Sequence, residues 1–145
     1  MFHLLVSGNG WEDGGGTMGN GRIYIDAETS PGSKMLTNGK LDIAKVGRIP
    51  ALLVSEPAGS GPEMTRVAYI TRLSPGHSET SFEYALDTSV VGITNHELEK
   101  YSGQLKLGNF GLNHSHWKVC DVDLFKLLLT AQQRKAAARA NAATG

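Results

Sequence analysis

The chain lacks several features that would place it in a membrane or in an oxidising compartment. Its 145 residues include a single cysteine, so no disulfide can form within it. Its longest apolar run falls far short of the roughly 18 residues expected of a membrane span. The opening Met-Phe-His-Leu-Leu-Val-Ser-Gly has no basic leader, and its apolar stretch is too short for a secretory signal. We therefore expect a soluble, cytoplasmic protein with no membrane partner.

The chain also lacks net charge. Fourteen lysines and arginines balance fourteen aspartates and glutamates, which argues against a protein that holds nucleic acid by neutralising phosphates. From residue 124 onward, however, there are cations and no acids: Lys126, Arg134, Lys135 and Arg139. A nucleic-acid-binding barrel that uses the last three of these is one alternative, although no aromatic residues alternate with them to stack on bases.

The composition that is present suits one globular domain. Hydrophobic residues make up 40% of the chain and charged residues 19%, which is enough apolar material for a single core. No internal repeat or linker divides residues 1–145, so we expect one domain with a packed body over 1–129. Residues 130–145 are a basic, alanine-rich helix end with little side chain to bury. Self-association as a homodimer through this helix is a further expectation.

The first half of the chain predicts short strands between loops. Met1 to Val6 is apolar without clean alternation, which indicates a central strand. Residues 8–21 contain seven glycines and no apolar periodicity, so they are expected to form a mobile loop or a wide connection. Arg22 to Asp26 is expected to be a second strand, and Ile49 to Ser55 a third that tolerates Pro50 at its start. Residues 41–46 are too short to classify.

The strongest local signal is an antiparallel hairpin. Thr65 to Leu73 and Thr80 to Leu86 both alternate with a period of two, and residues 74–78 between them have turn chemistry. We expect Val67, Tyr69, Thr71 and Leu73 on one side of the first strand, with the aromatic residues of the hairpin on its buried face. The opposite, wetter face should carry Arg66, Arg72 and Glu83.

The second half predicts helices around one more strand. Thr94 or Asn95 can cap a short helix, because a glutamate follows at the third position, and Gly103 is the expected stop. His114 to Cys120 reads as a strand, and Asp121 is expected to begin a long amphipathic helix. The elements together predict an α+β fold: a curled, mainly antiparallel sheet or partly open barrel of about five to six strands, with both helices packed on it.

Two histidines near the C-terminal strand are the first candidate site. His114 and His116 are two apart, so both imidazoles lie on one face of a strand, as a metal site would need, and Cys120 or Asp121 could complete the ligands. Lys118 falls on the same face, where its positive charge would repel a metal cation. We therefore expect no metal and no other cofactor; a metal-dependent enzyme with a bound water as nucleophile is the alternative. The intervening Trp117 is expected to point into the core.

Cysteine and glycine chemistry give weaker candidates. Cys120 could act as a nucleophile near a helix start, but the carboxylates of Asp121 and Asp123 would raise its pKa, so a buried core cysteine is the better interpretation. The glycine-rich loop lacks the lysine and the helix start of a phosphate-binding loop. Trp11, placed among these glycines, is expected to be exposed and to serve in stacking or partner binding.

Three segments together resemble a family. The chain resembles a small uncharacterised bacterial domain in three places. They are His116-Trp117-Lys118-Val119-Cys120-Asp121-Val122-Asp123-Leu124-Phe125, Arg66 to Arg72, and Phe82-Glu83-Tyr84. That domain is carried on mobile gene cassettes such as those of integrons, and in genes that pair it with signalling or defence modules. The likeness covers most of Met1 to Leu129. It implies an origin on a bacterial mobile element and brings no activity, cofactor or catalytic residue.

These observations favour a non-catalytic module that binds a small molecule or a protein partner. Aromatic side chains, Tyr24 among them, are expected around a pocket near the hairpin and the histidine strand, with charged residues at its rim. A complete catalytic set is not apparent in the sequence, so an enzyme is the less favoured interpretation. The expected ligand-binding residues are Trp11, Arg66, Arg72, Glu83, Tyr84, His114, His116 and Trp117.

Overall fold

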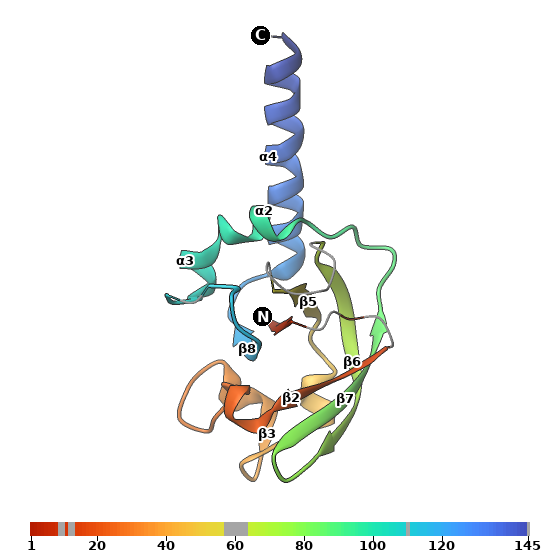
Figure 1. The fold of residues 1–145 in the computed structure, drawn as a ribbon, viewed down its shortest axis with the longest axis vertical. Helices are drawn as coiled ribbons and strands as arrows, with labels where there is room; N and C mark the ends of the chain where they lie inside the picture. Colours follow the sequence, from red (N-terminus) through yellow and green to blue (C-terminus); the bar gives the residue numbers. More distant parts are fainter. Residues whose placement is uncertain (9–10, 12–13, 57–63, 110, 145) are drawn as a thin grey trace.

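The fold is α+β, as the sequence predicts. The structure, a computed structural model, describes residues 1–8, 11, 14–56, 64–109 and 111–144 (Figure 1). Its main sheet contains β1 (Phe2–Ser7), β2 (Gly15–Gly19), β5 (Ala51–Ser55), β6 (Arg66–Pro75), β7 (Glu79–Leu86) and β8 (His116–Cys120). Their order is β2-β7-β6-β5-β1-β8, and every pairing is antiparallel except β1 with β5. Two short strands, β3 (Leu36–Thr37) and β4 (Lys40–Leu41), form a separate ribbon.

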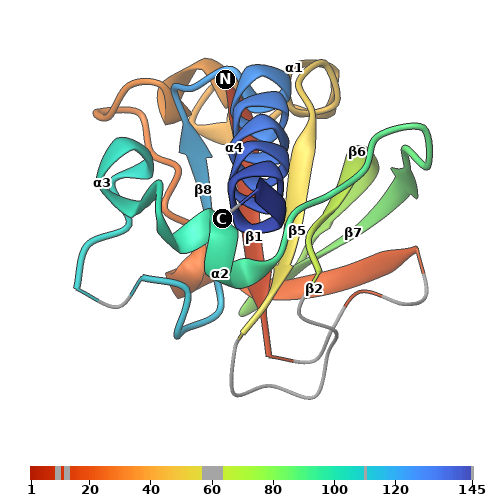
Figure 2. The ribbon, with the colours of Figure 1, turned by 90° about the horizontal axis from the view of Figure 1, so that it is seen from above.

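Helices cover one face of the main sheet, and short helices also lie in the segments that connect its strands. The longer connections contain the short helices η1 (Asn20–Arg22), η2 (Gly32–Met35), α1 (Ile43–Val46), α2 (Asn95–Glu99) and α3 (Ser102–Leu105), and the chain continues into α4 (Leu124–Thr144). Figure 2, which looks along α4, shows α2 and α3 beside it and β8, β1 and β5 around it. No described helix is long and apolar enough to cross a membrane.

Strand β1 is central, as its apolar sequence predicts. Its side chains alternate between two cores, because neighbouring residues of a strand point to opposite faces. Phe2, Leu4 and Val6 belong to the outer core beneath the helices, and Leu5 belongs to an inner core on the other face. A strand with both faces covered needs a near-continuous apolar run, which explains why its sequence does not alternate cleanly.

The glycine-rich stretch contains a strand that the sequence did not predict. Residues 15–19 form β2, which pairs with β7 at the edge of the sheet; residues 9–10 and 12–13 lie outside the described residues. A Cβ atom on Gly16 would lie 2.8 Å from the Trp11 ring, and one on Gly15 would lie 3.1 Å from the Phe82 carbonyl oxygen. These glycines therefore allow close packing against aromatic residues, where a loop was expected.

The strand expected over Arg22 to Asp26 is wrong. Arg22 ends η1, and of residues 22–26, all of them described, only Ile23 makes a β-bridge, to Trp117 on β8. The Tyr24 N–H then donates to the Trp117 carbonyl oxygen at 2.8 Å. This single point of pairing places Ile23 beyond β8, at the edge of the sheet opposite β2.

That arrangement requires the sheet to curl. Gly19 on β2 and Ile23 beside β8 are four residues apart, so the chain between them spans at most about 14 Å. In a flat sheet the six strand spacings from β2 to Ile23 would cover about 29 Å. The two edges must therefore curve toward each other. The expected curled sheet is confirmed, although the six described strands do not close into a barrel.

Hydrogen bonds from Asn20 fasten one end of this short connection. Its backbone N–H donates to the Ser78 carbonyl at 2.9 Å, and its side-chain amide donates to the carbonyls of Gly76 at 3.1 Å and His77 at 3.2 Å. The Thr80 hydroxyl donates to the Asn20 side-chain oxygen at 2.9 Å. One exposed asparagine thus ties η1 to the turn between β6 and β7.

The predicted hairpin of β6 and β7 is confirmed, but its faces differ from the expectation. A bulge between Ile70 and Arg72 interrupts the period of two. Ala68 and Ile70 therefore join the inner core before the bulge and Leu73 joins it after, while Val67 joins the outer core. Val67 and Leu73, expected on one side, are on different sides.

The short helices follow their capping residues. Thr94 caps α2 with a full capping box to Glu97, as the sequence predicts. Gly103 does not stop the helical segment; it lies inside α3, which ends at Lys106 in the left-handed conformation. Residues 41–46, too short to classify from sequence, include α1, which the Asp42 side chain caps by accepting from the Ala44 N–H.

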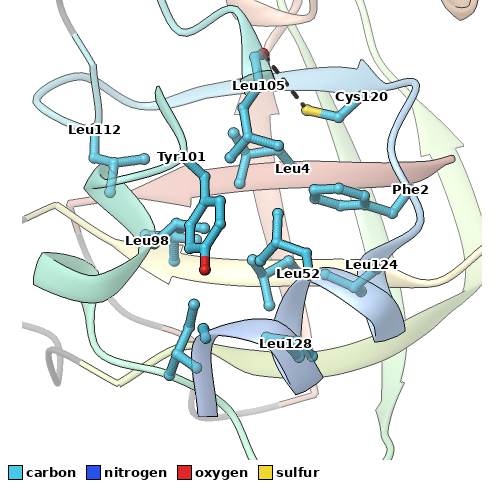
Figure 3. Packing of buried hydrophobic residues seen from close by; sticks show 14 of the residues in the cluster. Phe2, Leu4, Leu52, Leu98, Tyr101, Leu105, Leu112, Cys120, Leu124 and Leu128 are labelled. Atoms are coloured by element: carbon cyan, nitrogen blue, oxygen red, sulfur yellow. Dashed lines mark hydrogen bonds between the residues drawn. The ribbon is translucent and has the colours of Figure 1, made fainter. Parts of the chain in front are cut away.

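Helix α4 begins three residues later than expected, at Leu124. Asp121 precedes the helix, and the Asp123 carboxylate accepts from the Lys126 N–H at 3.1 Å. The first half packs on the outer core through Leu124, Leu127, Leu128 and Ala131 (Figure 3). Beyond residue 132 the described side chains are exposed, and the helix projects well past the rest of the chain (Figure 1).

The inner core is organised by a buried polar chain. Trp117 is fully buried, as predicted, and its Nε1–H donates to His3 Nδ1 at 3.1 Å. Because Nδ1 accepts, the proton of the neutral imidazole is on Nε2, which donates to the Val46 carbonyl at 2.9 Å. Burial lowers the pKa of His3 to about 4, so the ring is neutral near pH 7.

Two adjacent leucines of α4 test how its first half is held. Leu128 is 2% exposed and Leu129 is 55% exposed. Leu128→Ala should lower the free energy of unfolding by about 2–5 kcal/mol, because it opens a cavity in the outer core. Leu129→Ala should change it by less than about 0.5 kcal/mol. Urea denaturation of both variants provides the measurement, and equal losses would contradict the packing of α4.

The buried His3 should make stability depend on pH. Its pKa is about 4 in the folded chain, against 6.5 in the unfolded chain, so the unfolded state binds more protons between these values. Stability contributed by neutral His3 is complete above about pH 6.5 and falls by about 3 kcal/mol as the pH drops through 4. Urea denaturation at several pH values measures this slope.

The variant His3→Gln isolates the effect. A glutamine can accept from Trp117 and donate to the Val46 carbonyl, but it does not titrate. Its free energy of unfolding should fall less steeply than that of the wild type between pH 7 and pH 4. The exposed His77→Gln should keep the wild-type slope, and an unchanged slope in His3→Gln would show that His3 is not the buried titrating group.

Candidate functional site

A cavity at the outer side of β8 includes the predicted histidines. Its volume is about 570 Å³, which falls in the range of small-molecule sites. Its walls come from β8, from the end of α3 and from the loop that follows η1. The side chains that give it chemical character are Tyr24, Lys106, His114, His116, Lys118 and Asp121.

Three rings form the centre of this cavity, which we call the histidine cavity. The ring centroids of His114 and His116 are 4.9 Å apart at an interplanar angle of 86°. Tyr24 stacks on His116 with centroids 5.8 Å apart, and its hydroxyl lies 3.3 Å from His114 Nε2. The prediction that both imidazoles share one face is confirmed, although His114 precedes β8 and is not within it.

The β-bridge at Ile23 explains how Tyr24 reaches the histidines. Ile23 packs against the inner core beside Trp117, and the next residue of an extended chain points to the other face. Tyr24 therefore lies on the outer side, next to the imidazoles. The Arg22 guanidinium also donates to the Ser115 carbonyl at 3.2 Å, which ties η1 to the histidine segment.

Hydrogen bonding determines the tautomer of His116. Its Nδ1 lies 2.9 Å from the His114 carbonyl oxygen, which can only accept, so Nδ1 carries the proton. Burial lowers the pKa of His116, and the nearby charges of His114, Lys118 and Arg22 lower it further, against the hydrogen bond to His114. A neutral His116 therefore has an unprotonated Nε2, which makes no hydrogen bond with any described residue.

Lys118 anchors the cavity wall. Its ammonium donates to the carbonyl oxygens of Leu105 at 2.9 Å and Lys106 at 2.7 Å, the residues that end α3. A cation at these carbonyls also satisfies the unpaired acceptors at a helix C-terminus. Lys118 thus joins β8 to α3 and keeps positive charge beside the two histidines.

The ligand set proposed for a metal does not assemble. Among the described residues, no group of three or more histidines, cysteines, aspartates and glutamates is placed to hold a metal ion. Asp121 lines the same cavity but does not complete a set with His114 and His116. Lys118 lies on the same side of β8 as the histidines, as its spacing of two residues from His116 predicts.

Cys120 is a core residue, as the sequence analysis favours. It is 3% exposed, and its thiol lies 3.9 Å from the Leu105 carbonyl oxygen (Figure 3). Burial raises the pKa of Cys120 to about 11, against a smaller lowering by the Lys118 charge. The thiolate that a nucleophile requires is therefore scarce at neutral pH.

The aromatic residues expected at the ligand site lie instead in the inner core. Trp11, Tyr84 and Trp117 are each at most 6% exposed. The expectation that Trp11 is exposed is wrong: its ring lies 5.9 Å from Phe82 between centroids, and its Nε1–H donates to the Val54 carbonyl at 2.9 Å. The adjacent glycines let β2 approach this ring, so they bury Trp11 and do not present it to solvent.

The charged rim residues are not brought to the histidine cavity. Arg66 pairs with Leu53 and lines a separate hollow that includes Met64 and Leu86. Arg72 lies directly opposite Glu83 on β7. Because of the bulge, Arg66 and Arg72 lie on opposite faces of β6, so the shared wetter face predicted for them is wrong.

Sequence reasoning missed part of the cavity wall. Lys106 and the turn at residues 29–32 line the cavity, but both are separated from the histidines by long stretches of chain. The left-handed Lys106 has a φ of 55°, a conformation that its sequence does not signal. Of the aromatic residues expected around a pocket, Tyr24 lines this one.

Comparisons of the chain with protein-family models, with curated proteins and with solved structures give no match.

The thiol chemistry of Cys120 can be tested directly. With a pKa of about 11, roughly one thiol in a thousand is ionised at pH 8. Reaction of the folded chain with a disulfide reagent such as 5,5′-dithiobis(2-nitrobenzoate) should be at least about a hundredfold slower than that of the urea-unfolded chain. Absorbance at the thiolate product band follows both rates. A fast reaction of the folded chain would restore the nucleophile interpretation.

Proposed function

We propose that this domain is a non-catalytic small-ligand-binding module and that its ligand occupies the histidine cavity. The observation that carries the proposal is the convergence of Tyr24, His114 and His116 on a hollow of about 570 Å³. Binding sites combine apolar surface with a few precisely placed polar groups, and these three rings with Lys118 provide both.

A binding role is favoured over catalysis by the state of the reactive groups around the cavity. Burial raises the pKa of the Cys120 thiol, which makes it a poor nucleophile. Two of the three N–H donors of the Lys118 ammonium bond to backbone carbonyls, so this lysine is a fixed charge and not a mobile nucleophile. What is left at the centre is a set of rings held by hydrogen bonds and stacking, which is suited to contact with a ligand.

Three expectations from the sequence belong to the same proposal. The resemblance of residues 116–125 to a cassette-borne bacterial domain supports an origin on a mobile element. The single, buried cysteine fits a reducing cytoplasm. Self-association is supported by the exposed second half of α4 and by Phe125 and Leu129, which are 43% and 55% exposed on that helix.

A ligand screen tests the binding role. Thermal denaturation against a library of metabolites and nucleotides should reveal compounds that raise the melting temperature, because a ligand that binds the folded state stabilises it. Isothermal titration calorimetry then gives the affinity of each compound. Tyr24→Ala and His114→Ala should weaken binding by about tenfold or more, since each removes a ring from the cavity.

The control is His77→Ala, which removes an exposed histidine of the β6–β7 turn and should leave affinity unchanged. Circular dichroism of each variant checks that the fold is retained. If no compound shifts the melting temperature, or if Tyr24→Ala and His114→Ala bind every compound as the wild type does, the proposed site is wrong.

A further inference from the structure

The histidine cavity is bordered mainly by positive charge. Lys106 and Lys118 line it, and the Arg22 guanidinium lies beside it on the Ser115 carbonyl. Asp121 is the one acidic side chain among the described residues that line the cavity. Burial is the main cause that lowers the pKa of His116, and the nearby charges of Lys118 and Arg22 lower it further.

Two acidic side chains on the neighbouring segments, Asp26 and Glu56, bond to other partners. The Asp26 carboxylate accepts from the Thr29 hydroxyl at 2.8 Å and from two backbone N–H groups of its own loop. These hydrogen bonds lower the pKa of Asp26, and the bond from the Thr29 hydroxyl has the largest effect. The Glu56 carboxylate accepts from the Ser115 hydroxyl at 2.8 Å. Neither carboxylate lines the cavity.

Hydrogen-bonding capacity also remains on the cationic side. An ammonium has three N–H donors, and Lys118 uses two of them on the carbonyls of α3. Its third donor has no partner in the part of the chain that the structure describes. Lys106 is exposed at the cavity edge, so its ammonium can approach a bound group.

The rings add a preference for shape. Tyr24 stacks on His116 yet is 48% exposed, so part of its aromatic surface is open to a ligand. Flat rings pack well against such a surface, whereas a small hydrated ion gains nothing from it. Cation and ring lie in the same hollow, which suits a ligand with both a planar part and a negative charge.

We propose that the ligand of the histidine cavity is a small planar molecule with a carboxylate or phosphate group, the planar part lying on Tyr24 and the anion facing Lys106 and Lys118. This inference rests on the proposed binding function and adds the charge and shape of the ligand. The attraction is partly exposed to solvent, so it weakens as the salt concentration rises.

A series of matched probes tests the charge. Benzoate, benzamide and benzamidinium share one ring and differ in carrying a negative, zero or positive charge, and inorganic phosphate has the charge without the ring. Titrations followed by nuclear magnetic resonance of the Tyr24 and histidine ring signals give the four affinities. Benzoate should bind at least about fivefold more tightly than benzamide, with benzamidinium and phosphate weaker than benzoate.

Variants locate the anion. Lys106→Asn removes one charge and suits the left-handed backbone at this position. Lys118→Met removes the other charge, and its fold is checked by circular dichroism because Lys118 also joins β8 to α3. Lys106→Asn should lower benzoate affinity by about threefold or more and leave benzamide affinity unchanged. Lys40→Gln, an exposed lysine of β4 away from the cavity, should change neither affinity.

The outcomes separate the two proposals. Equal or tighter binding of benzamide or benzamidinium, phosphate binding as tight as benzoate, or no binding of any probe would overturn the planar anion. An insensitivity of benzoate binding to both Lys106→Asn and added sodium chloride would overturn it as well. The binding function itself would still stand if library compounds of another charge bind and depend on Tyr24 and His114, and would fail if none do.

Discussion

The short connection from Gly19 to Tyr24 is the constraint on which the rest of the structure depends. It leaves one edge of the sheet at β2 and reaches the opposite edge at β8 within a few residues, so the sheet has to curl. Hydrogen bonds from Asn20 and the Tyr24 N–H hold its two ends. The curl encloses the tryptophan-rich inner core, and the same connection delivers Tyr24 to the histidines outside it.

Strand β8 serves both sides of this arrangement. Its inward residues, Trp117 and Val119, belong to the inner core, where Trp117 donates to a buried, neutral His3. Its outward residues, His116 and Lys118, line the histidine cavity. Since a strand alternates its side chains, one five-residue segment anchors the core and builds the candidate site. A substitution of Trp117 would therefore alter the cavity, although Trp117 itself does not line it.

Local patterns were sufficient for some parts of the site and misleading for others. The shared face of His114 and His116 follows from a period of two, which needs only neighbouring residues. The faces of Arg66 and Arg72 could not be predicted in the same way, because one bulge changes the parity of β6. Trp11 was expected in solvent since glycines surround it, yet these glycines allow β2 to pack against its ring.

The sequence by itself determined the α+β class, the β6–β7 hairpin, the capped α2, the inward Trp117 and the long terminal helix, because each depends on periodicity, turn chemistry or capping within a few residues. Only the tertiary structure decided the pairing of β2, the curl of the sheet, the burial of His3 and the walls of the cavity. These depend on contacts between distant residues, such as the hydrogen bond from Trp117 to His3, 114 positions apart. No local pattern encodes which distant partner a strand edge or a buried ring will meet.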